Sequence, residues 1–165
     1  MRALAVLVAL ACGCSVDVGA GSIPPVAIDA PVDDSSAPPV SMPMEVEFLS
    51  ADDSQAMESQ YGDKLGAVTA IDLSVQALDV LDERNNPVAG GVLTVTFDGV
   101  TLKKVGDRVR LPDALKKQMI SAIRSGSALD IDVQATVDWS PPPPSPMDAH
   151  AVVQPIFVVD GLKAL

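Results

Sequence analysis

The sequence predicts a mainly β fold, an antiparallel β-sandwich with one α-helix at about residues 112–125. Apolar and polar residues alternate in several runs, most clearly over 129–139, as expected for strands with one buried and one solvated face. Asn, Asp, Gly and Pro separate these runs, as turns require. Apolar residues make up 48% of the chain but aromatics only 3%, so the core must be largely aliphatic.

The chain has 165 residues, which fits one domain with a tail. Its formal net charge is −11, and because an acidic surface repels phosphate we expect no nucleic-acid partner. Cys12 and Cys14 are the only cysteines, so we expect no disulfide framework and no cysteine metal site.

The N-terminus has the organisation of a secretory signal over residues 1–14. Arg2 gives a positive start, residues 3–11 are apolar, and small residues follow. The apolar run is shorter than the roughly 20 residues that span a bilayer. A cysteine directly after such a run resembles the lipobox of bacterial lipoproteins, in which the signal is cut before a cysteine that is then acylated. The resemblance implies that Cys12 or Cys14 is the lipid-attachment site. The alternative is an ordinary secretory signal.

Residues 15–43 are rich in proline and small or polar residues, without sustained periodicity. Because proline restricts itself and the preceding residue to extended conformations, we expect a semi-rigid, disordered linker. The folded domain is then predicted to span 44–165. Its first part is a short strand at 44–48, followed at 51–66 by a loop or a weak helical turn.

Residues 68–99 predict an antiparallel hairpin with Asn85, Asn86 and Pro87 in its turn. The alternation changes phase at Leu78. Because a one-residue slip turns every later side chain over, we expect a β-bulge near Ala77 and Leu78, or a strand that passes between sheets.

The segment VLDERNNPVAGGVLTVTFDG, with Asp82, Pro87, Val88 and Gly90-Gly91, resembles the strand–turn–strand opening of bacterial immunoglobulin-like and carboxypeptidase-regulatory-like modules. The resemblance implies an immunoglobulin-like β-sandwich with a binding or structural role rather than catalysis.

Residues 100–111 predict a smaller hairpin that turns at Gly106 and Asp107, with Val105, Val109 and Leu111 on one face. The helix follows, starting at Pro112-Asp113 and ending before Gly126. Apolar residues recur along it at helical spacing, and they are Leu115, Met119, Ala122 and Ile123.

The last two strands are predicted at 129–139 and 151–160, joined by a stiff connector of prolines at 141–146. The final strand is apolar on both faces, which favours a central position. Pro155 conflicts with this, since proline is confined to edge strands or bulges, and we give the proline more weight.

No residue pattern indicates catalysis, a metal site or a cofactor. His150 is the only histidine and flanks the proline tract in a predicted loop; we expect it to be a solvated residue at the start of a strand rather than part of a nucleophilic triad. Carboxylates could bind calcium if their strands converged, but the calcium-loop spacing is missing, and a solvated acidic face is the main expectation. These carboxylates are Asp72, Asp79, Asp130, Asp132 and Asp138.

Cations are concentrated in one region with few acids. They form a candidate basic patch for anionic lipid or an acidic envelope protein; the alternative is ordinary solvation and ion pairing. The patch residues are Lys103, Lys104, Arg108, Arg110, Lys116, Lys117 and Arg124.

Taken together, these patterns favour a non-enzymatic cell-envelope lipoprotein with a structural or partner-binding head. It would be anchored to the outer membrane or face the periplasm, or else be secreted. One alternative is a carrier of lipid or another hydrophobic ligand, with a cavity lined by Leu115, Met119 and Ile123. A secreted hydrolase is the least favoured alternative.

Overall fold

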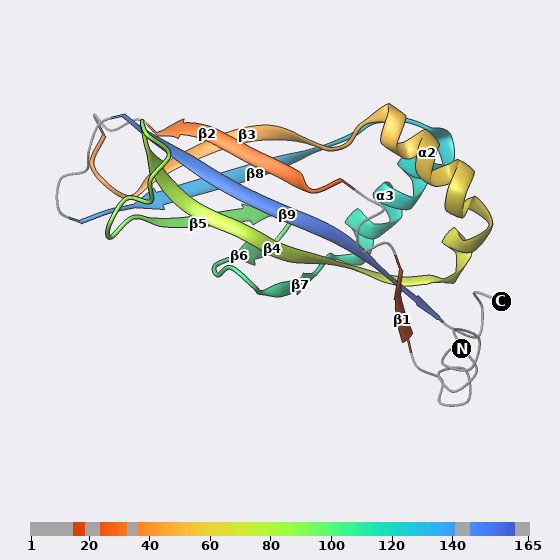
Figure 1. Ribbon diagram of the computed structural model, residues 1–165. Coiled ribbons are helices and arrows are strands. Elements are labelled where there is room, and N and C mark those ends of the chain that lie inside the picture. The colour runs from red at the N-terminus through yellow and green to blue at the C-terminus, as the bar shows by residue number, and fades with distance from the viewer. Residues whose placement is uncertain (1–14, 19–23, 33–35, 141–145, 161–165) are drawn as a thin grey trace.

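Two antiparallel sheets pack face to face in the computed structural model (Figure 1), which describes residues 15–18, 24–32, 36–140 and 146–160. The predicted β-sandwich is confirmed. Its strands are β1 (Ser15–Val18), β2 (Val26–Val32), β3 (Val40–Leu49), β4 (Val68–Asp82), β5 (Val92–Phe97), β6 (Val100–Leu102), β7 (Arg108–Arg110), β8 (Leu129–Asp138) and β9 (Met147–Asp160). Sheet A has the order β1-β9-β4-β7, with β2 also paired to β9; sheet B has the order β3-β8-β5-β6.

The core lies between the inner faces of the two sheets. Strand β8 shows the expected alternation: its inner side chains are buried, and its aspartates are exposed on the outer face of sheet B. On the inner face of sheet B, the ring centroids of Phe48 in β3 and Phe97 in β5 lie 6.1 Å apart. The inner residues of β8 are Ile131, Val133, Ala135 and Val137.

The predicted hairpin of β4 with β5 is wrong, because the two strands belong to different sheets. Beyond an isolated bridge between Leu81 and Pro87, the connection leaves sheet A and enters sheet B. The backbone approaches its neighbours closely at this crossing, at two positions where only glycine fits. A Cβ on Gly90 would lie 2.7 Å from the carbonyl oxygen of Ser140, and one on Gly91 would lie 2.9 Å from Val80 Cβ.

The hairpin predicted over 100–111 is also wrong, since β6 pairs with β5 in sheet B and β7 pairs with β4 in sheet A. The hairpin at this place is β5–β6. Asp98 and Gly99 form its turn with φ of 43° and 78°, as the two-residue turns that favour hairpins require.

The predicted bulge in β4 is confirmed. The register with β9 shifts between Val75, opposite Val153, and Ala77, opposite Val152. Because the shift inserts one residue, the apolar side chains on both sides of it face the core: Leu73 and Val75 before it, and Val80 after it.

Strand β9 is central, so the prediction that Pro155 places it at an edge or bulge is wrong. Its pairing to β2 ends at Val153, and its pairing to β1 resumes at Phe157. Pro155, which has no N–H to donate, therefore lies where the outer neighbour is interrupted, while Leu73 of β4 is its partner on the other side.

The linker predicted over 15–43 needs correction in its described part. Strand β2 pairs with β9 over seven residues and buries Val26, Ile28, Ala30 and Val32. Strand β3 begins at Val40, before the predicted domain boundary. The alternation in VAIDAPV is typical of a strand, but it is only seven residues long and lies in a proline-rich segment, which was therefore interpreted as a linker. An edge position tolerates Pro31, which explains how β2 includes it.

Two helices, α2 (Ala51–Tyr61) and α3 (Asp113–Ser125), lie at one end of the sandwich with the short 3₁₀ helix η1 (Gly62–Ala67) (Figure 1). Helix α3 confirms its prediction, and Gly126 ends it with a left-handed φ of 62°. Helix α2, expected as a loop or weak turn, has three turns. Ser50 caps it by accepting a hydrogen bond from the Asp53 N–H.

Candidate functional site

The predicted signal and both candidate lipid-attachment residues, Cys12 and Cys14, lie outside the described residues. The structure does describe the segment that follows them. Ser15 is the first residue of β1 and pairs with Asp160 at the C-terminal end of β9. None of the described helices is long and apolar enough to cross a membrane.

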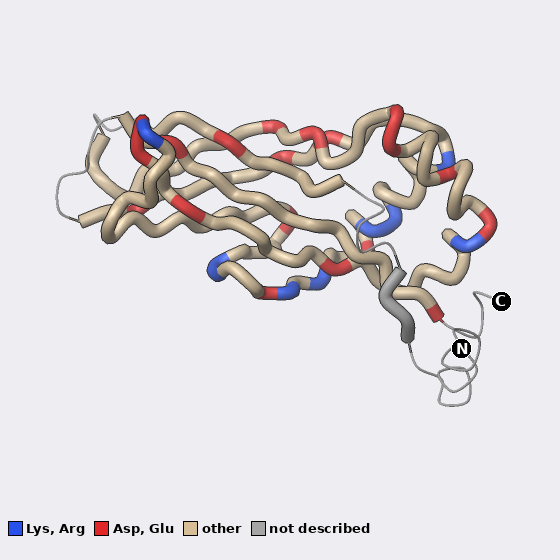
Figure 2. The backbone as a smooth tube through the Cα atoms, in the orientation of Figure 1, with Lys and Arg blue, Asp and Glu red and all other residues tan. Residues whose placement is uncertain are grey.

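The structure divides the candidate basic patch into two groups. Lys103, Lys104, Arg108 and Arg110 belong to the β6–β7 segment at the edge of the sandwich, whereas the remaining three cations are on helix α3. Figure 2 shows Lys and Arg along the β6–β7 segment, while Asp and Glu are spread over the other strands and α2. The sequence correctly located an excess of cations, but it did not indicate that they form two groups.

Arg108 and Arg110 bind one carboxylate on the outer face of sheet A. Their Nε atoms lie 2.8 Å and 3.0 Å from the two oxygens of Asp72, which is 6% exposed. Burial by itself would raise the pKa of Asp72, but the hydrogen bonds and positive charges of Arg110 and Arg108 outweigh it and hold the pKa below its usual value. This cluster joins β7 to β4.

On helix α3, Lys116 has a structural role. Its Nζ lies 2.8 Å from Asp113 Oδ1 and donates to the carbonyl oxygen of Thr69, which connects the helix to β4. The hydrogen bond and charge of Lys116 lower the pKa of the Asp113 carboxyl. Lys117 and Arg124 are exposed on the same helix.

The turn between β6 and β7 presents an apolar side chain to solvent. Val105 is 49% exposed, so its predicted place on the buried side of a hairpin is wrong. It follows Lys103 and Lys104, and Gly106 after it has a φ of 88°. We call residues 103–107 the basic tip. The sequence showed a valine beside two lysines, but its exposure was not apparent because the alternation placed it on one face with Val109 and Leu111.

The candidate calcium carboxylates are not brought together. Asp130 and Asp132 lie opposite Glu47 and Glu45 on the outer face of sheet B, whereas Asp72 belongs to sheet A. Within the described ranges, no three His, Cys, Asp or Glu side chains are placed to hold a metal ion.

The turn at residues 82–87 is held by a local network. The Asp82 carboxylate accepts hydrogen bonds from the N–H groups of Asn86 and Arg84. These bonds, Asn86 first, lower the pKa of the Asp82 carboxyl. The side chain is therefore used to form the turn, as an Asx motif does.

His150 lies within strand β9, which starts at Met147 and therefore earlier than the predicted residue 151. Its Nδ1 is 2.6 Å from Asp29 Oδ1 on β2, and Asp79 of β4 is opposite it on the other side. The contact links the neighbouring strands β2 and β9 on the outer face of sheet A.

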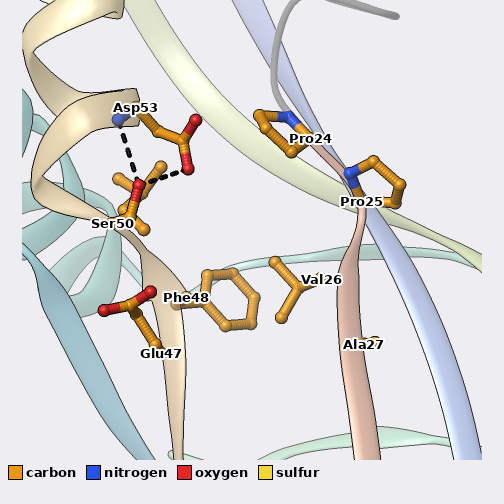
Figure 3. Close-up of a pocket in the computed structure, with 9 residues that line it drawn as sticks. Pro24, Pro25, Val26, Ala27, Glu47, Phe48, Ser50 and Asp53 are labelled. Atoms are coloured by element: carbon orange, nitrogen blue, oxygen red, sulfur yellow. Dashed lines mark hydrogen bonds between the residues drawn. The ribbon is translucent and has the colours of Figure 1, made fainter.

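Two small pockets are lined by described residues. One, of about 180 Å³, opens between β2 and β3 beside the start of α2, where Pro24, Pro25, Phe48 and Asp53 lie around it (Figure 3). The Ser50 cap of α2 forms part of its wall. The other, of about 290 Å³, is formed by residues 58–64 at the end of α2.

No protein-family model matches this chain, and neither a curated protein nor a solved structure matches it. The candidate sites therefore stand on their own geometry.

Proposed function

We propose that the protein is a non-enzymatic cell-envelope lipoprotein whose β-sandwich head acts as a structural or partner-binding module. The anchor in this proposal rests on the N-terminal sequence, with Cys12 or Cys14 as the acylated residue. The role of the head rests on how the sandwich is packed.

One observation favours a module over a carrier of hydrophobic ligands. The side chains that would line a carrier cavity are part of the core: Leu115 is 4% exposed, and Met119 and Ile123 are fully buried. Because the space between α3 and the sheets is filled by protein atoms, a ligand would have to displace native packing. The two described pockets, of about 180 and 290 Å³, are not lined by any of these three side chains.

The position of β1 supports a head held close to the membrane. Only one peptide bond separates Cys14 from Ser15, where β1 begins. If the anchor is at Cys14, the sandwich starts at the lipid, because a residue extends the chain by only about 3.5 Å. In this arrangement no long linker separates the lipid from the head, in contrast to the linker predicted over 15–43.

The anchor is tested by replacing both cysteines with serine and fractionating cells that produce the protein. We expect Cys12→Ser/Cys14→Ser to move from the membrane fraction to the soluble fraction, because acyl chains supply most of the membrane affinity. The single variants, as matched controls, identify which cysteine is acylated. A double variant that stays as membrane-bound as the wild type contradicts the anchor.

The head is tested by native mass spectrometry of the soluble Cys12→Ser/Cys14→Ser chain. We expect a mass equal to that of the polypeptide, because the core leaves no room for a ligand between α3 and the sheets. A lipid-sized mass that persists under native conditions and is lost on unfolding would instead support the carrier. Met119→Trp, which enlarges a core side chain, should then compete with that ligand.

A further inference from the structure

The basic tip combines two features that are separate elsewhere on the described surface. Val105 and Val92 are the two large hydrophobic residues that are markedly exposed, at 49% and 57%. Val105 follows two exposed lysines, whereas Val92 lies opposite Asp138 on the outer face of sheet B. The tip therefore presents an apolar side chain together with positive charge.

The tip is held firmly in place by strand β4. The N–H of Gly106 donates to the carbonyl oxygen of Val75 at 2.8 Å, and the N–H of Val75 donates to the carbonyl oxygen of Asp107 at 2.9 Å. These two bonds fix the base of the turn to sheet A. Val105 is thus presented in one orientation, and little conformational freedom remains to be lost when it contacts another surface.

The charge around the tip is positive although the chain as a whole is acidic. Lys103, Lys104, Arg108 and Arg110 face two carboxylates, Asp72 and Asp107. At physiological salt, charges beyond a Debye length of about 8 Å are largely screened, so a surface that meets the tip senses mainly these local cations.

We infer that the basic tip is a second membrane contact, in which Val105 enters the interface of an anionic leaflet and Lys103 and Lys104 bind lipid phosphates. Cationic side chains are attracted to anionic lipids, and an apolar side chain between them adds buried area at the interface. This combination fits a phospholipid surface better than an acidic protein, because an acidic surface offers Val105 no apolar partner.

The inference rests on the proposed anchor, which would bring the basic tip close to the membrane. Strand β1, directly after Cys14, and strand β7, directly after the tip, belong to the same sheet, with β9 and β4 between them. In Figure 1, β1 and the β6–β7 segment both lie below the main body of the sandwich. A chain attached by its lipid would hold the tip near the leaflet, so a contact that is weak on its own becomes populated.

The test uses a chemical tether, so that it does not depend on acylation in cells. The full chain with Cys12→Ser is coupled through the Cys14 thiol to a maleimide lipid in vesicles that contain brominated phosphatidylcholine, with or without phosphatidylglycerol. Val105→Trp is the reporter, since bromine quenches a tryptophan that enters the interface. Val92→Trp is the matched control, and the unmodified background gives the signal of the buried Trp139.

In vesicles with phosphatidylglycerol, we expect quenching of the Val105→Trp reporter to exceed that of Val92→Trp at least several-fold, and to fall at high salt. Adding Lys103→Glu/Lys104→Glu to both tryptophan variants should abolish the difference in quenching between them. Lys64→Glu/Arg84→Glu, the charge-matched control at exposed positions, should leave it unchanged.

Equal quenching at the two positions, or none at either, overturns the membrane contact and leaves the cations to a protein partner. Equal quenching in the Lys103→Glu/Lys104→Glu and Lys64→Glu/Arg84→Glu variants would also overturn the membrane contact. Because the tether is synthetic, these results do not bear on the proposed anchor. Conversely, membrane fractionation of the cysteine variants tests the anchor without involving the tip.

Discussion

Deletion of Ser74 is expected to remove much of the stability of the protein. The register with β9 shows one extra residue in β4 between Val75 and Ala77, and this bulge keeps the apolar residues facing the core on both of its sides. With one residue fewer before the bulge, either the bulge closes, so that Val75 turns outward and Gln76 takes its buried place, or Ile71 and Leu73 turn outward. These three apolar side chains are at most 1% exposed in the native core.

Burying an aliphatic side chain contributes about 1.5–3 kcal/mol, and burying an unpaired amide costs about 1–3 kcal/mol. Either outcome therefore removes about 3–6 kcal/mol from a domain stability of about 5–15 kcal/mol. We expect the urea transition, followed by circular dichroism, to move to much lower urea or to disappear. The matched control is deletion of Gln76, which removes the unpaired residue of the bulge and keeps the β4–β9 pairs on both sides, and it should cost about 1 kcal/mol. Equal destabilisation by the two deletions would contradict the role of the bulge in setting the faces of β4.

Replacing both arginines that bind Asp72, as Arg108→Met/Arg110→Met, is expected to destabilise the protein at neutral pH by about 1–3 kcal/mol. The change leaves the Asp72 carboxylate buried without its charged partners. The cost stays below the roughly 3–5 kcal/mol of a fully buried pair, because the Arg108 and Arg110 side chains are 41% and 66% exposed.

The pH dependence gives this prediction a distinctive signature. The pKa of Asp72 is below its usual value of 3.8 in the folded protein. Its ion pairs therefore contribute fully above pH 3.8, and the contribution is lost as the pH falls through the folded pKa. In the double variant, burial without the arginines raises the pKa of this carboxyl, so the variant gains stability when Asp72 is protonated.

The difference in the free energy of unfolding between wild type and variant should thus be large at pH 7 and clearly smaller at pH 3, measured by urea denaturation. Lys103→Met/Lys104→Met is the matched control. It removes two exposed cations from the same segment, whereas the ion pairs with Asp72 come from Arg108 and Arg110, and it should cost about 0.5 kcal/mol or less. An equal loss at both pH values, or an equal loss in the control, would contradict the role of the cluster.

Local patterns in the sequence were sufficient for several elements. The alternation over 129–139 identified β8, and Pro112 with Gly126 delimited α3. Helix α2 was missed because its apolar residues do not form a stripe along one face, although Ser50 and Asp53 carry a capping signal.

The candidate site was only partly accessible from the sequence. The run of cations was visible, but its division between the β6–β7 segment and α3 was not. The exposure of Val105 was hidden for a related reason. Alternation assigns a side chain to a face of a strand, whereas residue 105 lies in a turn whose position is set by the two hydrogen bonds to Val75.

The sequence by itself determined the fold class, the α3 helix and the phase change in β4, because each depends on the order of neighbouring side chains. The tertiary structure decided which strands pair. β4 and β5 are adjacent in the chain, yet β4 lies beside β9 and β5 beside β8. An alternating strand needs a buried face and a hydrogen-bonded neighbour, but its sequence does not specify which neighbour. That choice depends on how all the strands together cover one core.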